Sequence, residues 1–326
     1  NFGGDFISLS DGESILAEGS VLNGNGIIFV DKGATFTNNG VLFQGDILVS
    51  MSGTGSASIA ADTTFQELSG AGNLTLDGNS PTATLAGDRQ ATFSGQLLGA
   101  GTLLKTGRGV QFLNTSGNRN FNIDIQNGVM VVNAPETGSN AIEYAHINVG
   151  QPDGNPALRT ADATTTELHI LADTCAGSLT VNRGAALVLG SNSAAIVSDP
   201  VSLTLEGNAV FAEGSSISTI VPNSEGGVVS MGTITLPKTL SVTLVNYKSD
   251  GWEAPLPDLL VMHADQGFLN ANGTIIGKET TMSDWNVTLE KSIALFYTTA
   301  TLHLDTSGKK LVATPTGSRQ DNLLQQ

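Results

Sequence analysis

The sequence predicts an all-β protein, a solenoid of the parallel β-helix type that ends in an antiparallel β cap. Three observations predict it: the composition, a recurring glycine turn, and apolar residues that alternate with polar ones. Charged residues make up only 13% of the 326 residues, whereas glycine alone supplies 39. Helices normally fill their exposed faces with Glu, Lys and Arg. The composition therefore favours short strands joined by tight turns.

A Gly-x-Gly turn recurs along the first third of the chain. Its first glycines, Gly24, Gly53, Gly70 and Gly99, are 29, 17 and 29 residues apart (53 − 24, 70 − 53 and 99 − 70). A second unit places a glycine between two β-prone segments, as in residues 125–131, IQNGVMV. Glycine permits the backbone angles that turn a chain between strands. Self-similarity of this kind is typical of solenoid proteins.

The expected strands alternate with a period of two. Residues 202–205, 241–244 and 286–289 read SLTL, SVTL and NVTL, which places one apolar row inward and one polar row outward. We expect residues 1–232 to form coils of roughly 20–25 residues, a common repeat length. No segment of 12 or more residues keeps helical spacing. The best helical candidate, residues 258–268, is interpreted equally well as a strand followed by a loop.

The sequence changes character after about Gly232, and we predict that residues 233–314 form a C-terminal β cap. Both tryptophans lie in this block. Residues 301–304 and 309–312 flank the turn residues 305–308 and predict an antiparallel hairpin. A solenoid needs a cap because its last strands would otherwise pair edge to edge with other chains. Residues 315–326 are polar, and we expect a flexible tail.

The charge balance excludes several classes of partner. Thirty acids against 14 bases give a formal charge of −16, which disfavours nucleic acids and anionic membranes. No apolar run approaches the ~18 residues of a membrane span. We expect the single cysteine, Cys175, to act as a small buried apolar residue and not as a reactive thiol. Residues 1–5 carry no signal peptide, so we expect a mature or excised segment of a longer chain.

Residues 97–132 resemble the passenger-associated (autotransporter-associated) β-strand repeat. Residues 97–114 read LLGAGTLLKTGRGVQFLN, and the segment ends in the strand-Gly-strand unit at 125–131. Residues 68–76, LSGAGNLTL, resemble a truncated second copy. The loop at 115–121 departs from the aromatic-containing loop of the family. The resemblance implies a right-handed β-helix in a passenger region, secreted to the outer-membrane surface of a Gram-negative bacterium, and it transfers no catalytic residues.

Carboxylates are the first candidates for chemistry. A β-helix hydrolase places two or three acids on one face to cleave glycosidic bonds. The candidate catalytic residues are Asp46, Asp62, Asp77, Asp88 and Asp124. Chance alignment is the simpler interpretation in a chain with 30 acids.

Histidines are the second candidates. His146 and His169 are 23 residues apart (169 − 146), close to one coil, and Glu143 and Glu167 lie beside them. Imidazole and carboxylate together suit Zn²⁺, although a polar surface ladder is the favoured interpretation. We predict no cofactor. Lys105–Gly109 resembles a phosphate loop only superficially, because no Gly-Lys-Ser/Thr follows.

The sequence favours a structural or adhesive surface protein over an enzyme. Its expected partner is a host glycan or glycoprotein, bound by many weak contacts along a long face of Ser, Thr, Asn and acidic residues. The alternative is an extracellular hydrolase or lyase that acts on polysaccharide or mucin-like glycoprotein through paired carboxylates. Residues 133–166 are the candidate loop over its active site.

Overall fold

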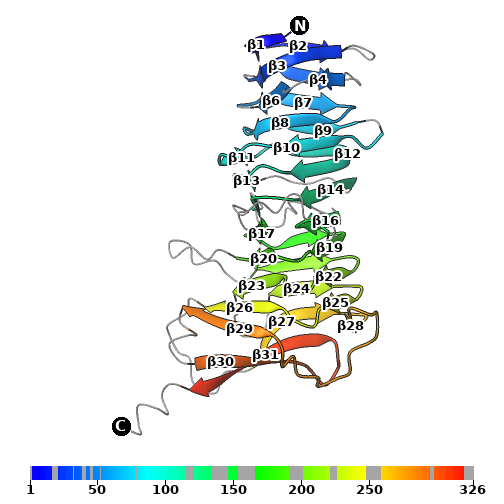
Figure 1. Cartoon of the computed structure of the whole chain (residues 1–326), viewed down its shortest axis with the longest axis vertical. Helices are drawn as coiled ribbons and strands as arrows, with labels where there is room; N and C mark the ends of the chain where they lie inside the picture. Colours follow the sequence, from blue (N-terminus) through cyan, green and yellow to red (C-terminus); the bar gives the residue numbers. More distant parts are fainter. Residues whose placement is uncertain are drawn as a thin grey trace. The chain divides into compact units, whose positions relative to one another are not determined.

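The computed structural model describes an all-β protein (Figure 1). It describes residues 2–16, 21–31, 33–38, 42–44, 47–51, 53–77, 79–114, 120–133, 146–152, 166–190, 201–220, 226–246, 258–291, 293 and 297–318. The chain divides into two compact units, residues 1–148 with 157–167 and residues 149–156 with 168–326. The division falls within β16 (His146–Val149) and β17 (Thr166–Ile170). No helix in the described part of the chain is long and apolar enough to span a membrane.

Unit 1 is a stack of parallel coils, as the sequence predicts. Its first sheet pairs β1 (Phe2–Leu9), β3 (Val21–Val30), β6 (Ile47–Met51), β8 (Thr63–Leu68), β10 (Thr82–Leu85), β12 (Gln96–Lys105) and β14 (Asn120–Ile125). The second pairs β2 (Glu13–Leu16), β4 (Thr35–Asn38), β7 (Ser56–Ile59), β9 (Asn73–Leu76) and residues 96–99 of β12. The third pairs β11 (Ala91–Phe93), β13 (Val110–Leu113) and β15 (Val129–Val132). Strand β5 (Leu42–Gln44) pairs with the start of β3.

Several glycines of unit 1 lie where one coil crosses so close to another that a side chain would collide. A Cβ atom on Gly95 would lie 1.4 Å from the carbonyl oxygen of Gly72, and one on Gly107 would lie 2.1 Å from that of Gly87. Gly99, with φ of 85°, lies where β12 passes from the second sheet to the first. The recurring Gly-x-Gly motif is therefore a steric requirement of the corners as well as a turn signal.

Unit 2 repeats the parallel arrangement on three sheets of its described residues. One pairs β18 (Thr174–Ala176), β21 (Ser202–Leu205), β24 (Gly227–Ser230) and β27 (Leu259–Ala264). A second pairs β19 (Ser178–Val181), β22 (Ala209–Phe211), β25 (Ile234–Leu236) and β28 (Phe268–Asn270). The third pairs β20 (Ala185–Leu189), β23 (Ser216–Ile220), β26 (Ser241–Asn246) and β29 (Asn286–Lys291).

The C-terminal end is antiparallel, but it begins later than the sequence predicts. Parallel pairing continues past residue 232 as far as β29, because 241–244 and 286–289 repeat the alternation of the earlier coils. Antiparallel pairing is confined to β30 (Tyr297–Leu304) and β31 (Lys310–Ser318), with β31 also pairing with β27. The predicted hairpin across residues 305–308 is confirmed.

Two further expectations about this end are settled by its hydrogen bonding. For residues 258–268 the sequence allowed either a helix or a strand followed by a loop. In the structure they form β27 and the turn into β28. Residues 315–318 of the expected tail instead extend β31 and pair with the start of β30. Residues 319–326 lie outside the described residues.

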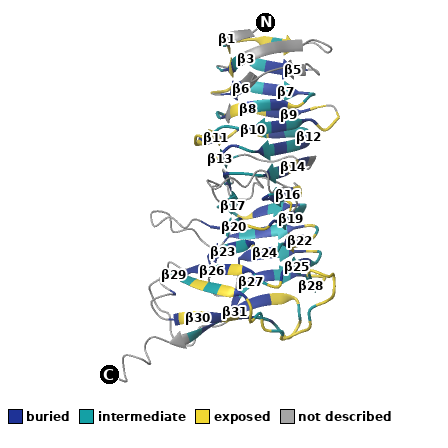
Figure 2. Ribbon diagram, viewed as in Figure 1, coloured by how far each residue is buried: buried dark blue, intermediate teal, exposed yellow. Residues whose placement is uncertain are grey.

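The core of each unit consists of inward rows that stack coil upon coil. In unit 1 Val49, Phe65, Leu85 and Ile125 belong to one such row and are at most 4% exposed. In unit 2 the row of Leu187, Ile217 and Val242 is equally buried. Figure 2 shows the alternation of buried and more exposed positions along the strands. Burial of these rows supplies the main driving force for folding.

Candidate functional site

Three of the predicted catalytic residues, Asp62, Asp88 and Asp124, accept hydrogen bonds through their carboxylates. Asp62 Oδ1 accepts the backbone N–H of Thr82 at 2.8 Å, and Asp88 Oδ1 accepts that of Arg108 at 2.8 Å. In both cases the donor lies 20 residues later, which is one coil along the chain. Each side chain thus satisfies a backbone donor of the next coil. The Asp62 and Asp88 carboxylates therefore help to hold consecutive coils together.

The structure does not bring Asp62 and Asp88 to one place. Asp62 immediately precedes β8, whereas Asp88 follows the end of β10. Because these parallel strands lie side by side, the two carboxylates are at opposite ends of the same sheet. In a glycosidase the two catalytic carboxylates flank the same bond of the substrate. Asp62 and Asp88 are therefore not arranged as such a pair.

Asp124 is half-buried on β14, and both of its oxygens have partners. Oδ1 accepts a hydrogen bond from Asn148 Nδ2 at 2.8 Å, and Oδ2 accepts one from Gln126 Nε2 at 2.9 Å. Asp77 is exposed after β9, where its backbone N–H donates to the carbonyl of Ile59. Asp46 lies outside the described residues.

The predicted histidine pair is divided between two sheets. His146 is exposed on β16, in the sheet that contains β14, and His169 is half-buried on β17, in the sheet that contains β15. Glu167 is half-buried and donates its backbone N–H to Gly128, while Glu143 lies outside the described residues. Within the described ranges, no three side chains of His, Cys, Asp or Glu come together as a metal site would require.

Lys105 is a buried cation that the motif alone does not reveal. It ends β12, pairs in register with Leu85 and Ile125, and is only 1% exposed. Its Nζ donates to the carbonyl oxygen of Gly107. Burial lowers the pKa of Lys105 to about 8, an effect that the charge of Asp88 partly offsets. The Lys-x-Gly-x-Gly run therefore forms a corner around an inward-facing lysine.

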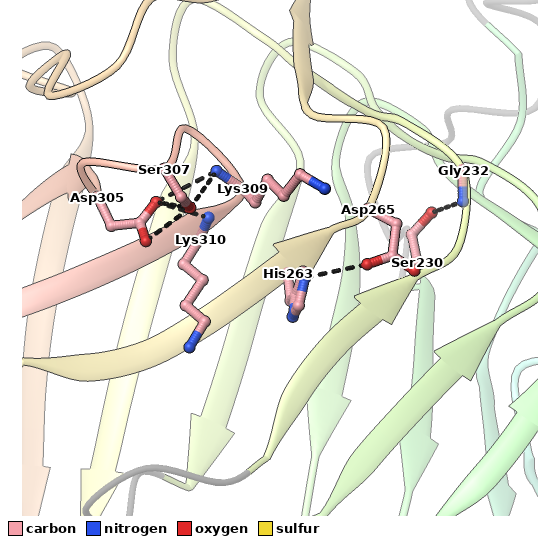
Figure 3. A network of polar contacts seen from close by, with 8 residues as sticks. All are labelled: Ser230, Gly232, His263, Asp265, Asp305, Ser307, Lys309 and Lys310. Carbon is pink, nitrogen blue, oxygen red and sulfur yellow. Dashed lines mark hydrogen bonds and ion pairs between the residues drawn. The ribbon is translucent and has the colours of Figure 1, made fainter.

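A polar network organises the C-terminal hairpin (Figure 3). The carboxylate of Asp305 accepts the Ser307 hydroxyl at 2.7 Å and the backbone N–H groups of Lys309 and Lys310 at 3.2 and 3.1 Å. Partial burial raises the pKa of Asp305, but these hydrogen bonds outweigh it, and the net pKa is lowered. His263 Nε2 lies 3.2 Å from Asp265 Oδ1 in the same region. The side chain of Asp305, the first residue of the predicted turn at 305–308, therefore stabilises that turn.

The outward surface of β23, β26 and β29 carries two rows of uncharged polar side chains. We call it the hydroxyl face, and its members are Ser216, Ser218, Ser241, Thr243, Asn286 and Thr288. Their register places Ser216, Ser241 and Asn286 in one row, and Ser218, Thr243 and Thr288 in the other. Each member is half-buried or exposed.

The hydroxyl face offers unused hydrogen-bonding groups. Ser216 Oγ makes a long contact of 3.4 Å with the carbonyl oxygen of Ala185. The side chains of Ser218, Ser241, Thr243 and Thr288 make no hydrogen bond to another described residue. A hydroxyl group can donate one hydrogen bond and accept two. Four of the six members of the face therefore offer free donors and acceptors.

No protein-family model and no curated protein matches this chain. The candidate site consequently rests on the geometry of the chain's own residues.

The sequence interpretation missed the structural role of the turn acids and the alignment of hydroxyls in rows from coil to coil. Asp173 accepts the backbone N–H of Ser202 at 2.8 Å, and Asn208 accepts that of Thr233, as Asp62 does for Thr82. The available signal was position, since Asp62, Asp173 and Asn208 each stand directly before a strand. The hydroxyl rows were visible as SVTL and NVTL. Only the register of the coils places them side by side.

Proposed function

We propose that this chain is a β-helical segment of a secreted bacterial surface protein and that it binds host or matrix ligands through the outer faces of its coils. The observation that carries the proposal is the hydroxyl face, where free donors and acceptors repeat from coil to coil. Many weak polar contacts of this kind add up along an extended ligand. The function is therefore adhesive, and it needs neither a metal nor a covalent step.

The repeat at 97–132 supports export to the bacterial surface. Its residues supply β12, β13, β14 and β15, so the motif corresponds to consecutive coil segments. Gly99, Gly101, Gly107, Gly109 and Gly128 of this repeat lie where a side chain would collide with the preceding coil. These are the features that the resemblance to passenger-type repeats implies, and they connect the motif with coil stacking in an exported β-helix.

A binding experiment tests the proposal. The purified chain, labelled with a fluorophore, is titrated onto immobilised mucin, onto matrix glycoproteins and onto fixed epithelial cells. We expect saturable binding to at least one of these surfaces that unlabelled chain displaces. Absence of saturable binding on all three would overturn the adhesive function.

The same preparation distinguishes adhesion from hydrolysis. It is incubated with polysaccharides and mucin, and released reducing sugar is measured over time. We expect no release above the buffer rate. Turnover that is abolished by Asp124→Ala, in a variant with an unchanged far-UV spectrum, would replace the adhesive function with the enzymatic one.

A further inference from the structure

The hydroxyl face has a geometry that selects among possible ligands. Side chains two positions apart along a strand are separated by roughly 6.5 Å, and equivalent side chains on neighbouring coils by about 4.8 Å. On β26, Ser241 and Thr243 form one such step, and the neighbouring strands repeat it in register. The ligand therefore meets a flat grid of hydrogen-bonding groups.

The six members are uncharged, and the charges lie at the border. Glu213 accepts both the hydroxyl and the backbone N–H of Thr239, two residues before Ser241. The hydrogen bond from the Thr239 hydroxyl is the main cause that lowers the pKa of Glu213, so this carboxylate stays ionised. Glu290 follows Thr288 on β29, and Lys238 is exposed beside Thr239. In a chain of formal charge −16, this border disfavours an anionic ligand.

The neighbouring faces of unit 2 lack this pattern. The outward row on β19, β22 and β25 runs Thr180, Val210, Thr235 and so alternates polar with apolar groups. The row on β18, β21 and β24 runs Cys175, Thr204, Val229. Among the described strands of this unit, the two adjacent polar rows are a property of β23, β26 and β29. Figure 2 shows exposed positions on both β26 and β29.

We infer that the hydroxyl face binds a neutral, extended, β-linked glycan, with the sugar chain running from coil to coil across β23, β26 and β29. This inference rests on the proposed adhesive function and names its ligand class. An extended β-linked glycan presents hydroxyl groups at an interval close to one coil. Sugar hydroxyls and protein hydroxyls can each donate and accept hydrogen bonds, so each can pair with the other in either direction. A coiled α-linked glycan does not keep this interval, and a sulfated or uronic-acid glycan meets the acidic border.

The test compares two sets of substitutions of similar chemistry on different faces of the same unit. The first combines Ser218→Ala, Thr243→Val and Thr288→Val, which removes one complete hydroxyl row. The control combines Thr180→Val and Thr235→Val on the neighbouring sheet. Both variants are first checked for an unchanged far-UV spectrum and melting temperature. Their binding to cellohexaose and mannohexaose is then measured by calorimetry, with maltohexaose and heparin as comparison ligands.

We expect the unaltered chain and the control to bind a β-linked hexasaccharide, and the row variant to bind it at least tenfold more weakly. Equal binding by the row variant would overturn the inference, as would a preference for maltohexaose or heparin. If the chain binds mucin or cells but neither β-linked hexasaccharide, the inference fails while the adhesive function stands. If it binds none of these, both fail.

Discussion

The buried charge of Lys105 lowers the stability of the fold that contains it. Its aliphatic stem continues the apolar row of Phe65, Leu85 and Ile125, but its ammonium group is withdrawn from water. One carbonyl hydrogen bond, from Nζ to Gly107, replaces part of the lost hydration. Burying a charged group costs free energy unless it is well paired. The stability of unit 1 should therefore depend on the charge of this side chain.

We predict that Lys105→Met stabilises the protein at pH 7. The folded pKa of about 8 lies below the ordinary 10.5, so the unfolded chain holds the proton more tightly. Wild-type stability should rise between pH 8 and about pH 10.5 and stay flat, at its lower value, below pH 8. The gain at pH 7 should be on the order of 3 kcal/mol. Urea unfolding at pH 7, 9 and 10.5 measures it.

Lys278→Met provides the control, because Lys278 is exposed and its charge already lies in water. Its stability should follow the wild type at each pH. A Lys105→Met variant that shows the same rise between pH 8 and 10.5 as the wild type would assign that rise to other groups.

Gly107 limits how closely two coils can approach. Gly107→Ala places a methyl group 2.1 Å from the carbonyl oxygen of Gly87, a backbone atom that cannot move without breaking the stack. We expect a loss of about 3 kcal/mol or more, at the upper end of what overpacking costs. Gly277→Ala is the control, since its nearest neighbour, Thr280 Oγ1, is 3.6 Å away. Thermal melts of both variants test this prediction. An equal change in melting temperature for Gly107→Ala and Gly277→Ala would contradict the steric argument.

At the scale of the element, the short strands depend on bonds between coils. A coil segment of four residues has few hydrogen bonds of its own, so it is ordered by its neighbours above and below. Turn acids add to this ladder, because they accept N–H groups that begin the next strand. The hairpin of β30 and β31 differs, since its turn is closed locally by Asp305.

We predict that Asp62→Ala and Asp88→Ala each destabilise unit 1 by about 0.5–1.5 kcal/mol, the net contribution of a hydrogen bond whose donor can bind water instead. Asp62→Asn should recover most of the loss, because an amide oxygen accepts the same bond, as Asn208 does in unit 2. Chemical denaturation measures these changes. A variant that retains full stability but loses hydrolytic activity would instead indicate a catalytic carboxylate.

At the scale of the whole molecule, the excess of acids opposes compaction. The formal charge of −16 creates repulsion among surface carboxylates in the folded state. The rows that stack inside each unit must outweigh this repulsion. Salt shortens the range of the repulsion, from roughly 10 Å at 0.1 M to about 3 Å at 1 M ionic strength.

We therefore predict that the melting temperature rises by a few degrees between 10 mM and 0.5 M sodium chloride. Differential scanning calorimetry measures the change. The uncharged osmolyte sucrose, matched in osmolality, separates screening from general exclusion effects. A melting temperature that is independent of salt would show that the carboxylates are too far apart, or too well paired, to repel one another.

The sequence by itself determined the local structure of this protein. Alternation in SLTL, SVTL and NVTL specifies which side of each strand faces inward, and the glycines mark the corners, because both signals act over a few residues. The hairpin at 301–312 was predictable for the same reason. Only the tertiary structure decided that Lys105 faces inward, that Asp62 and Asp88 bind the following coil, and that parallel coils continue to β29. These features depend on which residues lie one coil apart. Uneven loop lengths between strands hide that register from the sequence, and the hydroxyl face exists only because the register aligns its rows.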